Sequence, residues 1–310
     1  MIRNIKMGLK IENNAQVREK VRQKNVRDYF LKYSQAVRPW LKELTEKYKA
    51  KGEFPMIPMV VLPSYYADVK DKEIALFAGL LIKEDAEFEQ IREFREMLGE
   101  SPWEWFKNRG FVRLGIGRVQ DKRTGGVFNW TIAKLMDRLW DNCHILSGEI
   151  PTIGCKKTFI RPIGFEIDLI AKAQQCSYFD VLTYLVEDCC VGNYDYKLRL
   201  LLMIAAVSDG FGLGLWSVDP SELKSPLTTD LRTFLATFFS DYKRYGNSDD
   251  AIHLFGFERD CDFFYAYLAY KELQKRNPKV CSEFATTYLR WYEISARKKP
   301  YQFRAILPET

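Results

Sequence analysis

The residues best suited to chemistry are concentrated in one stretch of the chain, residues 197–234. This stretch carries the lysine Lys197 and three aspartates, Asp209, Asp219 and Asp230. A carboxylate can stabilise a developing positive charge, and it can orient or deprotonate a water molecule. A lysine amine can attack an electrophilic carbon and form a Schiff base if its pKa is depressed. Acid–base or covalent chemistry is therefore the kind of reaction that this stretch could support.

The order of elements in this stretch suggests how such residues would be positioned. The sequence predicts a buried helix, a Gly-rich turn, a Trp-bearing segment, a Pro-Leu pair and a second helix. We expect Asp230 in the first turn of the second helix, where an aspartate also stabilises the helix dipole. The hydroxyl of Thr228 could cap that helix or position a water molecule. Asp219 precedes a proline, which is typical of a turn that starts a helix.

The Gly-rich turn has two alternative interpretations. Gly212 and Gly214 could let backbone amides approach a phosphate closely. No strand is predicted before these glycines, so they do not form a dinucleotide-binding fingerprint. Trp216, which follows them, could line a pocket for a planar group or fill the core of the protein.

Positive charge is gathered near both ends of the chain. The net charge is +6, and residues 15–51 hold eleven Lys or Arg against four Asp or Glu. Such segments suit a polyanion such as nucleic acid, although a solvated helix face has the same composition. The residues that we expect to contact DNA are Arg18, Lys20, Arg22, Lys24, Arg297, Lys298 and Lys299.

The cysteines and histidines indicate the cellular compartment and argue against a metal site. The seven cysteines include no C-x-x-C pair, and the only histidines are His144 and His253. Reduced thiols in a cytoplasmic protein are the natural interpretation, and we predict no metal, no cofactor and no Ser-His-Asp triad. The N-terminus lacks an apolar core of signal-peptide length, and the apolar run 200–207 is too short to span a bilayer.

Helical periodicity dominates the chain, so the sequence predicts a mainly α fold. Expected helices cover residues 15–51 (one or two helices), 68–82, 88–98, a helix from 102, 129–142, 166–174, 178–188, a helix from 197, 229–239, 259–275 and 278–297. We expect an extended connector with three prolines over residues 54–63. Expected loops cover residues 121–126, 148–165 (with short strands) and 245–250. We expect a basic N-terminal helical extension (1–53), a central helical domain (54–275) and a C-terminal helix with a basic tail (276–310).

Four sequence segments, taken together, support a family resemblance. They are YYADVKDKEIALF at 65–77, LGESPW at 98–103, GLGLW followed by DPSEL and PL within 212–227, and DD before FGF and DFF within 249–264. In this order and spacing they resemble a little-characterised bacterial family allied to the helix-hairpin-helix (HhH-GPD) DNA glycosylases. That family opens the first segment with a Tyr-Ser-Asp-Pro-Arg-Asp-Arg-Glu-Ile pattern, and the resemblance extends over residues 63–273.

The resemblance implies a two-lobed helical fold of the helix-hairpin-helix glycosylase type, with an added basic N-terminal helical arm. Enzymes of this class flip a base out of double-stranded DNA and cut its bond to the sugar. The family's catalytic aspartate position falls on Thr228 and its histidine position on Asp230, so both are catalytic candidates. Lys197 lies within one residue of the family's Lys-Arg pair, which makes it the candidate for an additional strand-cleaving (lyase) step.

The resemblance also implies which residues would bind the substrate and which cofactor would be absent. The substrate-binding candidates are Trp216, Gly212, Gly214, Tyr65 and Tyr66. Some glycosylases of this class hold an iron–sulfur cluster on four closely spaced cysteines near the C-terminus. This chain has only Cys261 and Cys281 there, so we predict no cluster.

We therefore expect a monomeric, cytoplasmic, nucleoid-associated DNA glycosylase that excises a damaged or modified base to leave an abasic site. The altered aspartate segment favours an unusual target, such as a bulky modified base of the kind found in viral DNA, and hence an antiviral role. The alternative is a catalytically inactive DNA-binding reader of damaged or modified DNA. A base-modifying transferase is a third class, but no nucleotide-binding motif is present for its second substrate.

Overall fold

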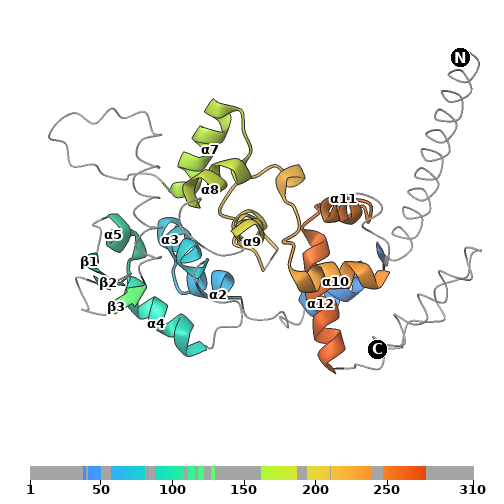
Figure 1. The fold of residues 1–310 in the computed structure, drawn as a ribbon, viewed down its shortest axis with the longest axis horizontal. Coiled ribbons are helices and arrows are strands. Elements are labelled where there is room, and N and C mark those ends of the chain that lie inside the picture. Colours follow the sequence, from blue (N-terminus) through green and yellow to red (C-terminus); the bar gives the residue numbers. More distant parts are fainter. Residues whose placement is uncertain are drawn as a thin grey trace, which may run out of the picture. The chain divides into compact units, whose positions relative to one another are not determined.

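The structure is a computed structural model, and it describes residues 38–39, 41–49, 57–80, 82, 88–107, 111–115, 118–121, 127–129, 162–186, 194–209, 211–238 and 247–276. Helices account for most of these residues, which confirms the predicted mainly α class (Figure 1). The chain divides into two compact units. The central unit is Pro55–Pro226, and the terminal unit joins Met1–Phe54 to Leu227–Thr310.

The first helices of the central unit are α2 (Pro58–Ser64), α3 (Val69–Gly79), α4 (Phe88–Leu98) and α5 (Pro102–Lys107). The extended connector expected over residues 54–63 is wrong from Pro58 on, because a proline fits the first position of a helix and α2 begins there. Helix α3 contacts the other three, and all of its residues from Glu73 to Gly79 are buried. The Asp68 carboxylate caps α3 by accepting a hydrogen bond of 2.9 Å from the Lys70 N–H. The apolar stripe of α3 therefore begins at a defined residue and faces the core.

A second aspartate of α3 fixes the start of α5. The Asp71 carboxylate accepts hydrogen bonds from the Trp103 N–H at 2.8 Å and the Ser101 hydroxyl at 3.2 Å. The first N–H groups of a helix have no partner within the helix, so this carboxylate satisfies one of them. Pro102 takes the first helical position, as its fixed backbone angle predicts. The packing of α3 against α5 thus rests on a specific polar contact.

A small antiparallel sheet was not predicted. It consists of β1 (Phe111–Gly115), β2 (Arg118–Asp121) and β3 (Val127–Asn129), in the order β1-β2-β3. The register shifts between Arg113 and Gly115, where β1 carries a bulge or irregularity. The helix expected over residues 129–142 lies outside the described residues, except that Asn129 belongs to β3 rather than to a helix.

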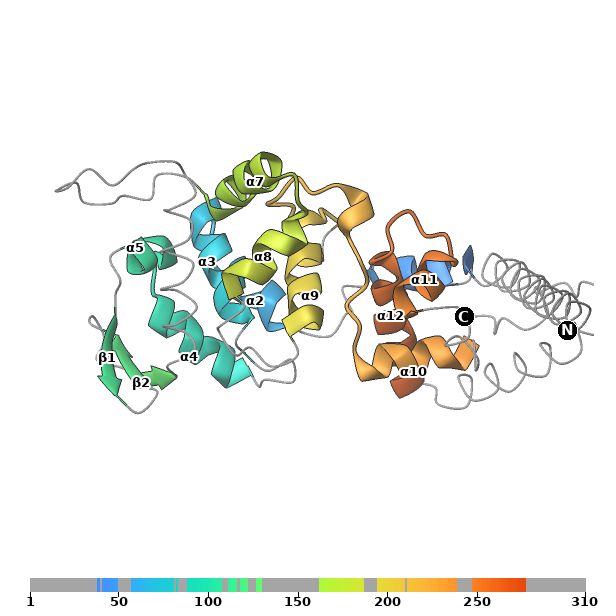
Figure 2. The ribbon, with the colours of Figure 1, turned by 45° about the horizontal axis from the view of Figure 1, so that its top comes forward.

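The second half of the central unit contains α7 (Ile163–Gln174), α8 (Tyr178–Val186), α9 (Tyr194–Ala206) and the short 3-10 helix η2 (Pro220–Glu222). Helix α8 contacts both α7 and α9 (Figure 2). The predicted loop over 148–165 is wrong at its end, because α7 already begins at Ile163, directly after Pro162. Helix α9 starts three residues before Lys197, and it is buried from Leu200 to Ala205.

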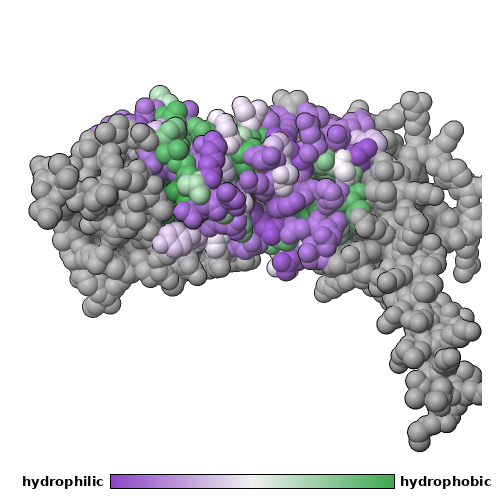
Figure 3. Space-filling view, turned by 90° about the horizontal axis from the view of Figure 1, so that it is seen from above, coloured by the Kyte–Doolittle hydropathy of each residue, from purple (hydrophilic) through white to green (hydrophobic). Residues whose placement is uncertain are grey.

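Some apolar side chains of the central unit remain at the surface. Figure 3 shows hydrophobic side chains among the largely hydrophilic described surface seen from above. Phe165 and Leu169 of α7 are both exposed and lie four residues apart, on one face of the helix. The three isoleucines of α7, Ile163, Ile167 and Ile170, are buried, so α7 carries apolar side chains on both its buried and its exposed side.

The terminal unit contains α10 (Thr229–Phe238), α11 (Ser248–His253), α12 (Asp262–Arg276) and a helical segment over residues 41–49. Its core is aromatic: the Phe234 ring of α10 lies 4.8 Å from the Tyr270 ring and 5.4 Å from the Phe263 ring of α12, between centroids. The predicted loop over 245–250 is wrong at its end, because a capping box between Asn247 and Asp250 starts α11 at Ser248.

The two compact units do not coincide with the three expected domains. The first boundary lies between Phe54 and Pro55, one residue from the expected position, whereas residues 227–275, expected in the central domain, and 276–310, expected as a separate part, group with the N-terminal residues. Contacts of residues 38–49 explain this grouping. The Lys49 ammonium lies 4.1 Å from the centre of the Tyr265 ring, and the Arg38 guanidinium donates to the Gly256 carbonyl at 2.5 Å.

Candidate functional site

Thr228 and Asp230 lie together at the start of α10, as the sequence predicts. The Thr228 hydroxyl oxygen accepts a hydrogen bond of 2.8 Å from the Leu231 N–H, so Thr228 is the N-cap of α10. Pro226 and Leu227 just before it are buried, which anchors the entry of the chain into the helix. Of the two interpretations of Thr228, this hydrogen bond supports helix capping. A role in positioning water remains a prediction.

Asp230 presents its carboxylate to solvent beside two side chains of α12. Its side chain is 68% exposed, and its Oδ2 lies 3.6 Å from the Lys271 ammonium. The Tyr267 hydroxyl donates a long hydrogen bond of 3.4 Å to the same oxygen. Lys271 and Tyr267 are four residues apart, so they lie on one face of α12. The first turn of α10 and this face of α12 therefore form a small polar cluster, Asp230–Tyr267–Lys271.

The charge states of this cluster follow from its surroundings. Burial alone would lower the pKa of Lys271, but the interactions with Tyr267 and Asp230 outweigh burial and raise the pKa of Lys271. Burial also raises the pKa of Tyr267, against the opposing influence of Lys271, so this phenol is neutral near pH 7. The negative partner of Lys271 at neutral pH is consequently Asp230. The cluster holds a protonated amine and not a free one.

Lys197 has a structural contact at the end of another helix. Its ammonium donates a hydrogen bond of 3.0 Å to the carbonyl of Leu80, the C-cap residue of α3. The last carbonyls of a helix lack partners within the helix, and a lysine is a common donor to them. Lys197 belongs to the central unit and Asp230 to the terminal unit, so the two predicted catalytic residues come from different compact units.

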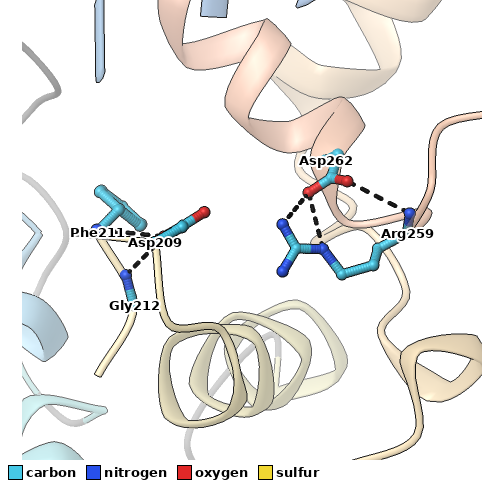
Figure 4. A network of polar contacts seen from close by, with 5 residues as sticks. All are labelled: Asp209, Phe211, Gly212, Arg259 and Asp262. Carbon is cyan, nitrogen blue, oxygen red and sulfur yellow. Dashed lines mark hydrogen bonds and ion pairs between the residues drawn. The ribbon is translucent and has the colours of Figure 1, made fainter. Parts of the chain in front are cut away.

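The Gly-rich turn folds back on the end of α9. The Asp209 carboxylate accepts hydrogen bonds from the N–H groups of Phe211 at 3.2 Å and Gly212 at 3.1 Å (Figure 4). The Gly214 N–H donates to the Val207 carbonyl at 3.0 Å. Figure 4 also draws an ion pair of the terminal unit, in which the Arg259 guanidinium lies 2.7 Å from the Asp262 carboxylate.

The geometry explains why this turn needs its glycines. A Cβ on Gly212 would lie 2.0 Å from the Val207 carbonyl oxygen, which is closer than any side chain can approach. Gly214 has a φ of 59°, in the left-handed region that side chains disfavour. The N–H groups of both glycines have partners inside the turn. Their predicted approach to a phosphate therefore gains no support from free amide donors.

Trp216 is a core residue held by a buried carboxylate that the sequence analysis did not single out. Only 5% of Trp216 is exposed, and its indole N–H donates to Oε1 of Glu73 at 2.9 Å. The Gly164 N–H donates to the same oxygen at 2.8 Å, and the Ile163 N–H donates to Oε2 at 2.6 Å. Glu73 of α3 thus joins the first turn of α7 to the tryptophan after the Gly-rich turn.

Burial and hydrogen bonding have opposite effects on the pKa of Glu73. Burial raises its pKa most, and the nearby negative charge of Asp68 adds to this effect, whereas the three hydrogen bonds favour the ionised form and lower the pKa. Burial prevails, so the pKa of Glu73 lies above its ordinary value. A signal in the sequence could have found this residue: Glu73 precedes the buried Phe77 by four positions, which puts it on the apolar face of α3.

The two predicted substrate-binding tyrosines differ in exposure. Tyr66 is buried, whereas Tyr65 is 36% exposed. The guanidinium of Arg95, on α4, lies 4.6 Å from the centre of the Tyr65 ring, at the distance of a cation–π contact. Of the predicted aromatic residues Trp216, Tyr65 and Tyr66, Tyr65 is thus the one with an exposed side chain.

Several predictions concern residues outside the described part of the chain. The cations expected to contact DNA, which are Arg18, Lys20, Arg22, Lys24, Arg297, Lys298 and Lys299, all lie there. Within the described ranges, no group of three or more His, Cys, Asp or Glu side chains is placed to bind a metal ion. None of the described helices combines the length and the apolar character that crossing a membrane requires.

Comparison with known proteins assigns no role to the candidate site. No protein family, no curated protein and no solved structure matches this chain.

Proposed function

We propose that this protein is a DNA glycosylase of the helix-hairpin-helix class, which flips a modified base out of double-stranded DNA and hydrolyses its bond to the sugar. The observation that carries the proposal is the exposed carboxylate of Asp230 in the first turn of α10, beside Lys271 and Tyr267. The division into two compact helical units is consistent with the two-lobed fold of that class. The enzyme acts as a cytoplasmic, nucleoid-associated monomer without a cofactor.

The chemistry requires a negative charge at the place where the sugar becomes cationic. When the C1′–N bond breaks, its electron pair leaves with the base and positive charge develops on the sugar. A preorganised group at such a position contributes on the order of 10²–10³ in rate. Asp230 supplies this charge, and the positive end of the α10 dipole favours a carboxylate in its turn.

Simple hydrolysis fits the two lysines better than a lyase mechanism. A Schiff base forms only from a neutral amine. The pKa of Lys271 is raised through Tyr267 and Asp230 despite burial, so its amine is protonated at neutral pH. Lys197 donates its protons towards the Leu80 carbonyl, a structural contact that a nucleophile would have to give up. We therefore propose an abasic site as the product, without strand cleavage.

Recognition of the substrate draws on aromatic and basic residues. Trp216 and Tyr66 are buried, so the half-exposed Tyr65 is the residue of the predicted set that could stack on a flipped base. The basic segments within residues 15–51 and 297–299 supply phosphate contacts. The target is a modified base, including bulky bases of viral DNA, which gives the enzyme a part in antiviral defence.

A second candidate function is a catalytically inactive reader of damaged or modified DNA. The contacts of Lys197, Thr228 and Trp216 favour it, because each of these residues has a structural partner: the Leu80 carbonyl, the Leu231 N–H and the Glu73 carboxylate. A reader needs only the basic segments and an exposed aromatic residue. It differs from the glycosylase in that Asp230 would have no part in any reaction.

The test is incubation of the purified chain with duplexes that carry normal, oxidised, alkylated or glucosylated bases. Released base is followed by mass spectrometry, and abasic sites by alkaline cleavage. We expect release from a modified duplex, and loss of this release in Asp230→Asn. The matched control is Asp249→Asn, which removes a first-turn aspartate from α11 and leaves the activity unchanged. Tight binding without release from any duplex would support the reader.

A further inference from the structure

Lys271 is a charged residue with no assigned role, although it lies at the proposed catalytic carboxylate. Its ammonium is 3.6 Å from Oδ2 of Asp230, and its side chain is 45% exposed. It also lies 5.8 Å from the centre of the Tyr267 ring, whose hydroxyl reaches the same carboxylate. An ammonium that contacts both a carboxylate and solvent can reach a ligand bound at that carboxylate.

We propose, building on the glycosylase function, that Lys271 is the acid that protonates the departing base and that Asp230 returns the proton to it. As the C1′–N bond breaks, the electron pair moves onto the base, which takes a proton from the Lys271 ammonium. Water then adds to C1′ and gives one proton to Asp230. That proton passes to the neutral Lys271 amine, so the net change is one water consumed and both side chains restored.

Electrostatics makes the return of the proton favourable. In the resting cluster burial lowers the pKa of Lys271, but its interactions with Tyr267 and then with Asp230 outweigh burial and raise it, so the amine carries a proton at neutral pH. After the base has left, the lysine is neutral and the carboxylate has gained a proton from water. An amine binds a proton far more strongly than a carboxylate does, so the proton moves back across the 3.6 Å pair.

The position of the pair in the fold supports a joint role. Asp230 is held by the α10 N-terminus, which Thr228 caps, while Lys271 is held by α12. Contact between the aromatic rings of Phe234 and Tyr270 fastens α10 to α12, with 4.8 Å between the centroids. This buried aromatic contact sets the positions of the two helices from which the partly exposed side chains of Asp230 and Lys271 approach each other.

The test compares poor and good leaving groups. Two substrates are prepared from a modified base that the wild-type protein releases. An electron-withdrawing ring substituent makes one base the better leaving group, and an electron-donating substituent makes the other the poorer one. Single-turnover release is then measured for the wild type and for Lys271→Met. We expect a loss of about 10²–10⁴ for the poorer leaving group, because a general acid contributes about this much, and a loss below about tenfold for the better one.

Two variants separate proton transfer from charge. Lys271→Arg keeps the positive charge beside Asp230 but gives up a proton very reluctantly, so it should show the same leaving-group dependence as Lys271→Met. The control Lys275→Met makes the same substitution one helical turn along α12, where Lys275 forms an i,i+3 ion pair with Glu272, and it should behave as the wild type. Circular dichroism and thermal melting establish that each variant is folded.

The outcomes distinguish this inference from the function on which it rests. Equal losses for both leaving groups, or full activity in Lys271→Met, would overturn the role of Lys271 while base release by the wild type keeps the glycosylase proposal. Trapping of a Lys271-dependent protein–DNA adduct with borohydride would also overturn it, since it would make Lys271 a nucleophile. Absence of release by the wild type would overturn the function and this inference together.

Discussion

The substitution Glu73→Gln tests the buried contact between α3, α7 and Trp216. In the native protein, Oε1 of Glu73 accepts from the Gly164 N–H and the Trp216 indole, and Oε2 accepts from the Ile163 N–H. A glutamine oxygen at the Oε1 position keeps the first two hydrogen bonds. Its amide nitrogen then faces the Ile163 N–H at the former 2.6 Å spacing, where two donors repel each other.

The magnitude follows from this geometry. The Ile163 N–H at the start of α7 loses its acceptor and remains a buried donor without one. Leaving a buried donor unsatisfied costs about 1–3 kcal/mol, and relief of the buried charge offsets part of it, so we expect a net loss of about 1–3 kcal/mol in unfolding free energy. For a unit of this size, 1 kcal/mol corresponds to about 2–4 °C, which gives a decrease of about 2–12 °C in Tm.

The assay is urea unfolding followed by tryptophan fluorescence, with thermal melting as a second measurement. Glu93→Gln is the matched control, because Glu93 is exposed on α4, and it should change the unfolding free energy by less than about 0.5 kcal/mol. Trp216→Phe removes only the indole donor and some ring contact. The double variant should therefore lose less than the sum of the two single variants. Equal stability of Glu73→Gln and the wild type would refute the network.

The remaining predictions concern pH, the turn, the cap and Lys197. Burial raises the folded-state pKa of Glu73, so the contribution of Glu73 to stability is present below its ordinary pKa of 4.5 and is lost as pH rises through the folded pKa. Urea titrations at several pH values should therefore show that the unfolding free energy of the wild type, relative to that of Glu73→Gln, decreases as pH rises. Gly212→Ala forces a Cβ to 2.0 Å from a carbonyl oxygen, and differential scanning calorimetry should show destabilisation by about 2–4 kcal/mol. Thr228→Ala removes the N-cap of α10 and should cost about 1 kcal/mol, with Thr228→Ser restoring most of it; unchanged melting of Thr228→Ala would contradict the cap. Lys197→Met should cost about 1 kcal/mol in the same melting assay and leave base release intact, whereas complete loss of release would make Lys197 a catalytic residue.

Local features of this chain could be predicted, because their causes lie within a few residues. Asp68 caps α3 by binding the Lys70 N–H, Asp219 starts η2 by binding the Ser221 N–H, and Thr228 caps α10. In each case an oxygen-bearing side chain stands just before a helix and satisfies a donor two or three positions later. The helical periodicity that continues from these caps predicted α3, α4, α8 and α10 in nearly their observed ranges.

The contacts that define the candidate site could not be predicted in the same way, because they join distant parts of the chain. The hydrogen-bond partners of Glu73 lie 90 to 143 residues away in the sequence, and the residues next to Glu73 in the sequence do not indicate which they are. Lys271 meets Asp230 only because α10 packs on α12 through aromatic rings. The sheet β1–β3 was also missed, since its strands are only three to five residues long and show little alternation.

The predicted catalytic and substrate-binding residues also fall in two different compact units. Lys197, Trp216 and the Gly-rich turn belong to the central unit, whereas Thr228 and Asp230 belong to the terminal unit. In sequence these residues lie within one short stretch, which made them look like a single site. Lys197, Thr228 and Trp216 have structural partners in the polypeptide. The Asp230 carboxylate contacts Lys271 and Tyr267 and stays 68% exposed.

The most direct test of the central claim is single-turnover release of base from modified double-stranded DNA by the wild type and by Asp230→Asn, with mass spectrometry of the free base. A catalytic Asp230 predicts release by the wild type and a loss of at least about 10²-fold in Asp230→Asn, with unchanged DNA affinity and melting. Equal rates of release in the two proteins would contradict the assignment of Asp230. Binding of modified DNA without any release by the wild type would contradict the glycosylase itself and identify the protein as a reader.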